Sequence, residues 1–231
     1  MKRLQQIIML GLVSILSFMS CAPDAAAFED DPRYERALPS ADIIIDAGHG
    51  GIDGGSFEGN VLEKDINLAV AKKLYVLLNK SGFRAVLNRS GDYALSDDNR
   101  WLPTRSRHHR DLSQRSQLTK EIETALVISL HVNSGKNKAT RGPLVLHQKN
   151  GQSALLANCI QDTLNKQQNA NRRPKLGKPF YLLNVVKAPA VIVEMGFISN
   201  PEERRLLTDP DYQMQTADAI ASGVRNYLLL Q

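Results

Sequence analysis

Three short apolar runs, each leading into a polar side chain that can bind a metal, constrain this chain most. Residues 43–45 (Ile-Ile-Ile) form a continuous β-branched run, which is typical of a strand buried on both faces of a parallel sheet. This run leads to His49, and two further runs end at His131 and Glu194. Ligands of open α/β sheets bind beyond the carboxyl ends of the strands. If the three strands are parallel neighbours, the three side chains meet in one crevice.

The order of the remaining segments predicts an α/β fold with a mostly parallel sheet, because strand patterns alternate with helix patterns. Strands are expected at 43–45, 84–87, 125–130, 143–146, 180–183 and 190–193. Helices are expected at 63–80, 111–124, 152–167, 201–208 and 210–229.

Glu63 opens the first helical pattern on its apolar side. Ile66, Val70 and Leu74 follow it by 3, 7 and 11 residues, which places all of them within about 60° of Glu63 around a helix. A carboxylate on the sheet-facing side of a helix is costly unless it is paired or bound to a metal. In the alternative, the helix starts after Glu63 and the carboxylate is exposed.

Two imidazoles and one carboxylate form a common catalytic zinc site that leaves a fourth position for water. Zinc lowers the pKa of that water to about 7 and polarises a carbonyl group. Glu194, as a carboxylate that is not a ligand, can take the proton of the water and deliver it to a leaving amine. Alone, His131 can be a structural histidine, and Glu194 can cap a helix or pair with a lysine. Their joint placement predicts Zn²⁺ on His49, Glu63 and His131.

At these residues the sequence resembles the zinc-dependent N-acetylmuramoyl-L-alanine amidases of amidase type 3, in their compact single-domain form. The matching stretches are residues 45–51 with 53–55, 62–65, 129–134 and 193–201, and the resemblance covers about residues 41–230. It implies a three-layer fold, with a twisted, mostly parallel six-stranded sheet flanked by helices. It also implies zinc on His49, Glu63 and His131, with Glu194 as the catalytic acid and base. The bond cut would join the lactyl group of N-acetylmuramic acid to L-alanine in peptidoglycan.

Two alternatives stay open at this point: a zinc peptidase or carboxypeptidase acting on the stem peptides, and an inactive wall-binding module. The chain departs from the family pattern at 119–120, where Thr-Lys replaces the usual Ala-Asn, and we expect that helix to lie away from the ligands. Residues 105–110, rich in Arg and His, are interpreted as a solvated or substrate-facing loop, and His147 as structural. We find no room between His131 and Glu194 for a long inhibitory insert.

The amino-terminal residues indicate export to the periplasm or cell envelope. Residues 1–27 have the positive start, apolar run and Ala-Ala-Ala end of a signal peptide. A lipoprotein signal that ends before Cys21, with the lipid on Cys21, and an uncleaved anchor are the alternatives. Residues 28–40 are interpreted as a linker and 41–231 as the catalytic domain. Cys159 then has no disulfide partner and is expected to be a small buried residue.

Composition adds little to this prediction. The formal net charge is +5, and a mild basic excess suits an anionic wall polymer as well as many other partners. We expect peptidoglycan as the substrate and no nucleic-acid partner, and we leave open whether a protein activates the enzyme.

Overall fold

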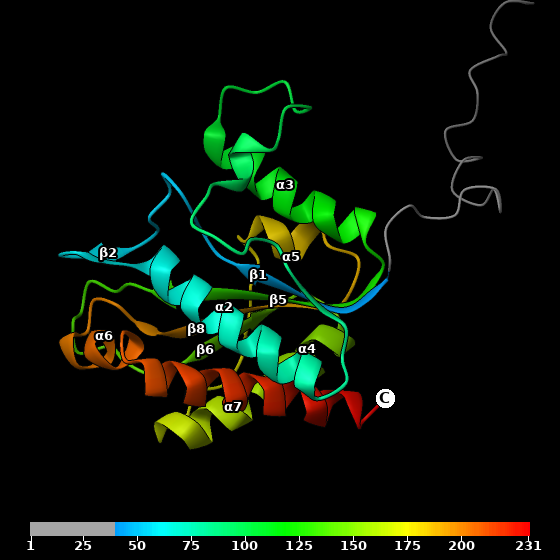
Figure 1. The fold of residues 1–231 in the computed structure, drawn as a ribbon. Coiled ribbons are helices and arrows are strands. Elements are labelled where there is room, and N and C mark those ends of the chain that lie inside the picture. The colour runs from blue at the N-terminus through cyan, green and yellow to red at the C-terminus, as the bar shows by residue number, and fades with distance from the viewer. Residues whose placement is uncertain (1–39) are drawn as a thin grey trace, which may run out of the picture. The chain divides into compact units, whose positions relative to one another are not determined.

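The computed structural model describes residues 40–231, which form an α/β fold around one central sheet (Figure 1). The six strands of the sheet, in their order across it, are β4 (Ala85–Leu87), β1 (Ala41–Ala47), β5 (Thr124–Asn133), β8 (Ala190–Phe197), β6 (Leu144–His147) and β7 (Lys175–Leu176). Every neighbouring pair is parallel except β6 with β8. The expected six-stranded, mostly parallel sheet is therefore confirmed.

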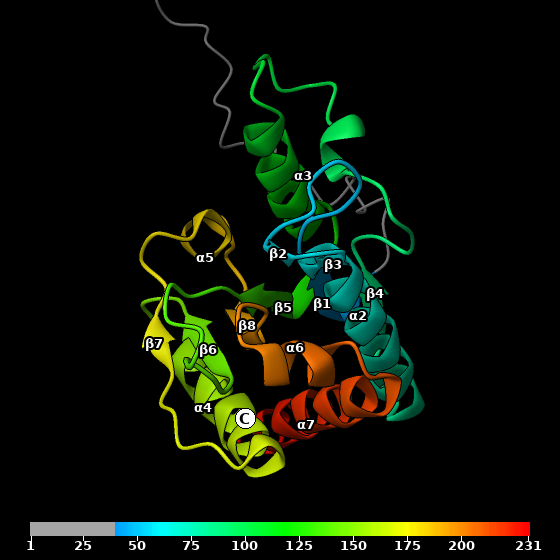
Figure 2. The same ribbon diagram turned by 90° about the vertical axis from the view of Figure 1, so that its left-hand side faces the viewer.

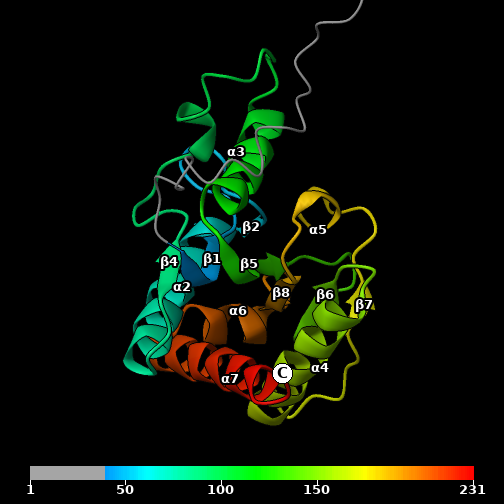
Figure 3. The same cartoon turned by 90° about the vertical axis from the view of Figure 1, so that its right-hand side faces the viewer.

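Helices cover both faces of this sheet. They are α2 (Glu63–Lys80), α3 (Arg107–Glu121), α4 (Gly151–Gln168), α5 (Tyr181–Val185), α6 (Pro201–Leu207) and α7 (Pro210–Leu228), with a 3₁₀ turn η2 (Leu95–Asp97). Helices α2, α4 and α7 lie on one face, and α3 and α5 lie on the other (Figure 2 and Figure 3). A short hairpin of β2 (Phe57–Glu58) and β3 (Val61–Leu62) leads into α2.

The continuous apolar run of β1 is explained by burial on both faces. Ile43 and Ile45 pack into the core shared with α2, α4 and α7, whereas Ile44 packs into the core on the α5 side. All three side chains are fully buried. Successive strand residues point to opposite faces, so a strand between two helix layers needs no polar alternation.

The register of the sheet brings the predicted site residues to one edge. Strands β1, β5 and β8 are consecutive parallel neighbours, so their carboxyl ends meet. His131 on β5 lies directly opposite Glu194 on β8. The crevice expected from the three apolar runs is thus formed at this edge.

The strand predicted at 180–183 is wrong. Residues 181–183 belong to the short helix α5 and Phe180 is its N-cap, and the sixth strand is instead β7 at Lys175–Leu176. A four-residue apolar run has no period that separates a strand from a helical turn. Leu182 and Leu183 are both buried because a single helical turn presses them against the sheet.

The helix predicted at 111–124 begins earlier, at Arg107, and ends at Glu121. The hydroxyl of Ser106 caps it by accepting a hydrogen bond from the backbone N–H of His109 at 3.2 Å. Residues 107–110 are therefore helical and not part of a loop as predicted. His147 ends β6, where its Nδ1 lies 2.7 Å from the carbonyl oxygen of Gln148.

The expected signal peptide, the lipidation site Cys21 and residues 28–39 of the expected linker lie outside the described residues. Within 40–231, no helix has the length and apolar composition needed to cross a membrane. Cys159 is a free thiol on α4 that is half-buried against the core, so its side chain is less enclosed than expected.

Candidate active site

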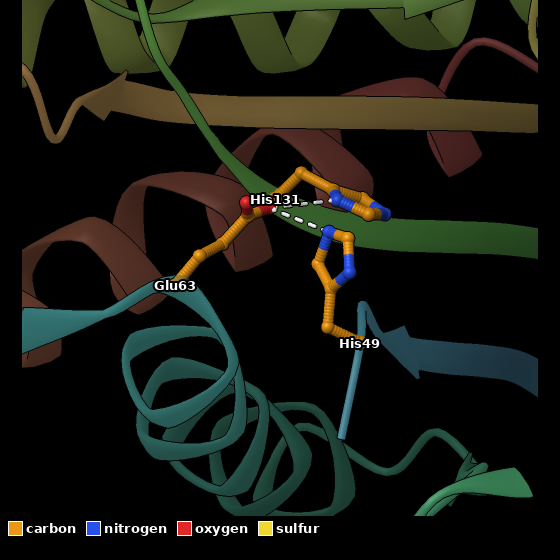
Figure 4. A group of neighbouring side chains, drawn as sticks. All are labelled: His49, Glu63 and His131. Carbon is orange, nitrogen blue, oxygen red and sulfur yellow. Dashed lines mark hydrogen bonds and ion pairs between the residues drawn. The ribbon is translucent and has the colours of Figure 1, made fainter. Parts of the chain in front are cut away.

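Three side chains from separate elements converge at the carboxyl edge of the sheet (Figure 4). His49 comes from the loop after β1, Glu63 is the first residue of α2, and His131 lies on β5. Oε1 of Glu63 lies 3.2 Å from Nε2 of His49 and 2.9 Å from Nδ1 of His131. One possible ligand atom from each residue lies within 4.8 Å of the other two. The structure thus brings together the three residues that the sequence pattern singled out.

The loop after β1 holds His49 in an uncommon backbone conformation. Its φ of 60° is in the left-handed region, which costs energy for a residue with a side chain and is over-represented at functional sites. Gly48 has no room for a side chain, since a Cβ atom there would lie 2.4 Å from the ring of His131. Gly55 is equally restricted, because its Cβ would lie 2.7 Å from both Glu63 and His49. Because Gly48 and Gly55 have no side chain, the backbone at these positions can lie close to His49, Glu63 and His131.

Glu63 is 2% exposed and is held by several donors. Its Oε1 accepts a hydrogen bond from the backbone N–H of Val132 at 3.0 Å, and its Oε2 accepts one from Ser56 at 2.8 Å. Burial alone would raise the pKa of Glu63, but the bonds from His131 and His49 outweigh it and hold the pKa well below its usual range. The carboxylate is therefore ionised and faces the sheet, as the helical spacing predicted.

Asp53 orients His49 from the other side of the ring. Its Oδ2 lies 3.1 Å from Nδ1 of His49. When Nδ1–H donates to a carboxylate, Nε2 keeps its lone pair and can bind a metal. Burial opposes protonation of His49, but Asp53 and Glu63 outweigh it and raise the pKa of the metal-free imidazole to about 9. Asp53 belonged to a matching stretch of the sequence, but its orienting role was missed.

Glu194 stands beside the cluster and does not share its hydrogen bonds. It is 7% exposed, and its Oε2 is buried without a hydrogen-bond partner among the described residues. Burial raises the pKa of this carboxyl group to about 7. A buried, unpartnered oxygen that can be protonated near neutral pH is suited to move a proton.

A cavity of about 520 Å³ opens over these side chains. His49, Glu63, His131 and Glu194 line it at the sheet, and residues of α3 and α5, among them Leu112, form its other walls. The expectation that α3 lies away from the ligands is therefore wrong. The sequence could not show that this helix crosses the carboxyl edge of the sheet.

Arg115 of α3 is a buried residue of the site that sequence reasoning missed. It lies 2.6 Å from Asp46 and from Asp111, and its Nη2 donates to the carbonyl oxygen of His49 at 2.9 Å. Burial would raise the pKa of Asp46, but Arg115 and Ser129 outweigh it and keep the pKa below its usual value. The only sequence signal was Asp46 at a strand end. The ion pair of Asp46 with Arg115 joins residues 69 positions apart, so no local sequence pattern predicts it.

The donor set fits a zinc ion. Zinc in catalytic sites takes imidazole nitrogens and carboxylate oxygens, usually three protein ligands with one open position. Here His49, Glu63 and His131 supply such a set, Asp53 orients one imidazole, and a cavity gives access to the remaining side. Glu194 lines the same cavity, and its Oε2 has no hydrogen-bond partner among the described residues.

An imidazole–carboxylate–imidazole cluster at the carboxyl edge of an α/β sheet, beside a carboxyl group that can be protonated, fits a metal-dependent hydrolase. The chain belongs to the N-acetylmuramoyl-L-alanine amidase family Amidase_3, whose sequence profile matches residues 43–226. The germination-specific N-acetylmuramoyl-L-alanine amidase of Bacillus subtilis is 35% identical over 187 residues, which are 80% of this chain and 78% of that protein.

Solved structures of amidases share the fold. The CwlD amidase of Clostridioides difficile, solved in complex with the GerS lipoprotein, matches with a TM-score of 0.78 and 34% identity over 83% of this chain and 100% of that chain. The catalytic domain of CwlV from Bacillus (Paenibacillus) polymyxa matches with a TM-score of 0.71 and 29% identity, covering 83% of this chain and 99% of that chain. The expected family and fold are confirmed, and so is the expected enzyme class, which hydrolyses an amide in peptidoglycan. Neither the zinc peptidase nor the wall-binding module is favoured.

Proposed function

We propose that this amidase uses zinc, held by His49, Glu63 and His131, to hydrolyse the amide between the lactyl group of N-acetylmuramic acid and L-alanine. The observation that carries the proposal is the buried oxygen of Glu194, which lacks a partner beside a cluster of three ligand-type side chains. When bound there, zinc would polarise the amide carbonyl and acidify water.

Asp53 and Glu194 would have the other roles in the reaction. Asp53 holds Nδ1 of His49, so that the ring keeps one tautomer and one orientation. The carboxylate of Glu194 takes a proton from the attacking water and gives it to the nitrogen of the leaving L-alanine. Its pKa of about 7 means that the carboxylate and the carboxylic acid are both populated near neutral pH. One residue can therefore act as base and then as acid.

The test is mass spectrometry of purified peptidoglycan after digestion by the full-length chain, with chelator and with zinc added back. We expect free stem peptides that begin with L-alanine, and glycan chains that keep their lactyl groups, only when metal is present. Stem peptides shortened while still attached to the glycan would support the zinc peptidase instead. Binding to the wall without any product would support the wall-binding module.

We also propose that the chain is exported, because its substrate belongs to the cell wall and residues 1–27 have the pattern of a signal peptide. Mass spectrometry of the mature protein distinguishes a start at Phe28 from a lipid-modified Cys21, and either result would support export. An unprocessed chain in the cytoplasm would contradict it.

A protein partner is a further part of the proposal, because the Clostridioides difficile relative was solved with a lipoprotein. We expect an envelope lipoprotein to increase the rate of product release by this chain. An unchanged rate in the presence of the lipoproteins of the same cells would contradict this.

A further inference from the structure

Arg89 follows β4 and is a buried cation that the mechanism does not use. It is 1% exposed. Its guanidinium donates hydrogen bonds to the carbonyl oxygens of Ala47 at 3.1 Å, Gly48 at 3.1 Å and Lys64 at 2.8 Å. A fourth bond, to Gly91 at 3.0 Å, ties the guanidinium to its own loop. All four acceptors are backbone carbonyls.

These acceptors lie next to two proposed metal ligands on different elements. Gly48 directly precedes His49 in the loop after β1, and Lys64 directly follows Glu63 in the first turn of α2. Nη2 of Arg89 alone donates to both Gly48 and Lys64. One planar group therefore joins the two segments that carry His49 and Glu63.

The burial of this cation is not explained by ion pairing. Among the described residues, no carboxylate lies within 4.0 Å of Arg89 in an ion pair, and burial lowers the pKa of its guanidinium. A buried charge is costly unless its donors are satisfied, and carbonyl oxygens compensate less than a carboxylate does. The rigid fork of arginine is suited to hold several acceptors in fixed relative positions.

The packing around Arg89 also favours a fixed geometry. A Cβ atom on Gly50 would lie 3.1 Å from Nε of Arg89, so the loop of His49 rests directly on the side chain. The ammonium group of the half-buried Lys64 donates to the carbonyl oxygen of Gly51 at 2.8 Å and makes a second link between the same segments. Arg89 is the buried link of the two.

We infer that Arg89 is a positioning residue that sets the separation of His49 and Glu63 for metal binding. It acts only through the backbone beside these ligands, and it does not line the cavity over Glu194. This inference rests on the proposed metal site. It concerns how strongly the metal is held, so it can be tested without measuring turnover.

The test measures the dissociation constant for zinc of the full-length chain by competition with a chromogenic chelator, and compares wild type with Arg89→Met and Arg89→Lys. Arg89→Met keeps a long side chain but loses every donor, and we expect binding about 10–100-fold weaker, the usual range for groups behind metal ligands. Arg89→Lys keeps the charge but loses the planar guanidinium that holds several acceptors, so we expect a dissociation constant between those of Arg89→Met and wild type.

Two control variants separate positioning from general stability. Arg84 lies in the segment just before β4, is exposed and bonds Asp42, so Arg84→Met should bind zinc like wild type. Leu164→Ala removes a fully buried side chain on α4, away from the cavity, and should lower the melting temperature without changing zinc affinity. The absorption spectrum of bound Co²⁺ should shift in Arg89→Met and not in Leu164→Ala.

Wild-type zinc affinity in folded Arg89→Met would overturn the inference, as would an equal loss of affinity in Leu164→Ala. If Arg89→Met does not fold, Arg89→Lys carries the test: weaker binding supports the inference and wild-type binding overturns it. If wild type itself binds no zinc, the proposed metal site is wrong, and the inference falls with it.

Discussion

Oδ2 of Asp53 lies 3.1 Å from Nδ1 of His49, while Nε2 of the same ring faces Glu63 at 3.2 Å. The imidazole is thus held through one nitrogen and presents the other to the cluster. A carboxylate on Nδ1 favours the tautomer that carries its proton there and leaves Nε2 free to bind a metal. The arrangement favours metal binding before any substrate arrives.

Replacing Asp53 should weaken metal binding without abolishing the fold. We expect Asp53→Ala to raise the dissociation constant for zinc about 10–100-fold, because the orienting acceptor is lost. Asp53→Asn keeps an acceptor oxygen and should have a smaller effect. Isothermal titration calorimetry measures both, with Asp218→Ala on the exposed side of α7 as the control. Unchanged affinity in Asp53→Ala would contradict the orienting role.

Glu194→Gln should separate catalysis from metal binding. The side chain keeps its size but can no longer take a proton, so we expect turnover to fall at least about 100-fold while bound zinc stays at the wild-type level. Product release and zinc content are measured on the same samples, with Glu202→Gln as the exposed control. Zinc loss as large as in His131→Ala would mean that Glu194 is itself a ligand.

The same residue should make the metal-free protein sensitive to pH. Burial raises the pKa of Glu194 to about 7, above its ordinary value of 4.5, so the folded state binds the proton more tightly than the unfolded state. The resulting stabilisation is fully present below about pH 4.5 and is lost as the pH rises through about 7. Each pKa unit corresponds to about 1.4 kcal/mol, so the full loss is roughly 3 kcal/mol.

Chemical unfolding of chelator-treated wild type and Glu194→Gln at pH 5 and pH 8 measures this loss. The free energy of unfolding of wild type should fall more than that of the variant over this interval. Groups that do not interact with Glu194 titrate alike in both proteins, so their contribution cancels in the difference. Parallel changes in the two proteins would show that Glu194 does not titrate as proposed.

Gly48→Ala tests how closely the backbone must approach His131. The added Cβ would lie 2.4 Å from the imidazole and 2.7 Å from the carbonyl oxygen of Leu130. We expect a loss of about 1–3 kcal/mol in unfolding free energy, as for other overpacked sites, together with weaker zinc binding. Gly151→Ala, where nothing lies within 4 Å, is the matched control and should leave stability unchanged or raise it by up to about 1 kcal/mol. Equal effects of the two substitutions would contradict the contact.

The parts of the site that the sequence predicted rest on local patterns. Continuous apolar runs identified the buried strands β1, β5 and β8, and strand ends at one sheet edge placed His49, His131 and Glu194 together. The helical period after Glu63 put that carboxylate on the buried side of α2. Each inference needed only neighbouring residues and a general rule about sheets or helices.

The parts that could not be predicted depend on contacts between distant residues. Arg115 meets Asp46 across 69 residues, and Arg89 reaches Gly48 across 41. The residues next to each of these arginines in the sequence do not distinguish it from an arginine on the surface. For the same reason the sequence does not predict the course of α3 over the cavity. The apolar run of α5 is too short to show whether its period is that of a strand or of a helix.

A zinc titration of the chelator-treated full-length chain, with release of stem peptides that begin with L-alanine measured at each step, tests the proposed metal site and the proposed activity together. We predict no release without metal, a rise in proportion to added zinc, and saturation at one zinc ion per chain. His131→Ala should not recover activity at the same zinc concentrations. Full release by the metal-free chain, or equal recovery in His131→Ala, would contradict the proposal that His49, Glu63 and His131 hold the catalytic metal.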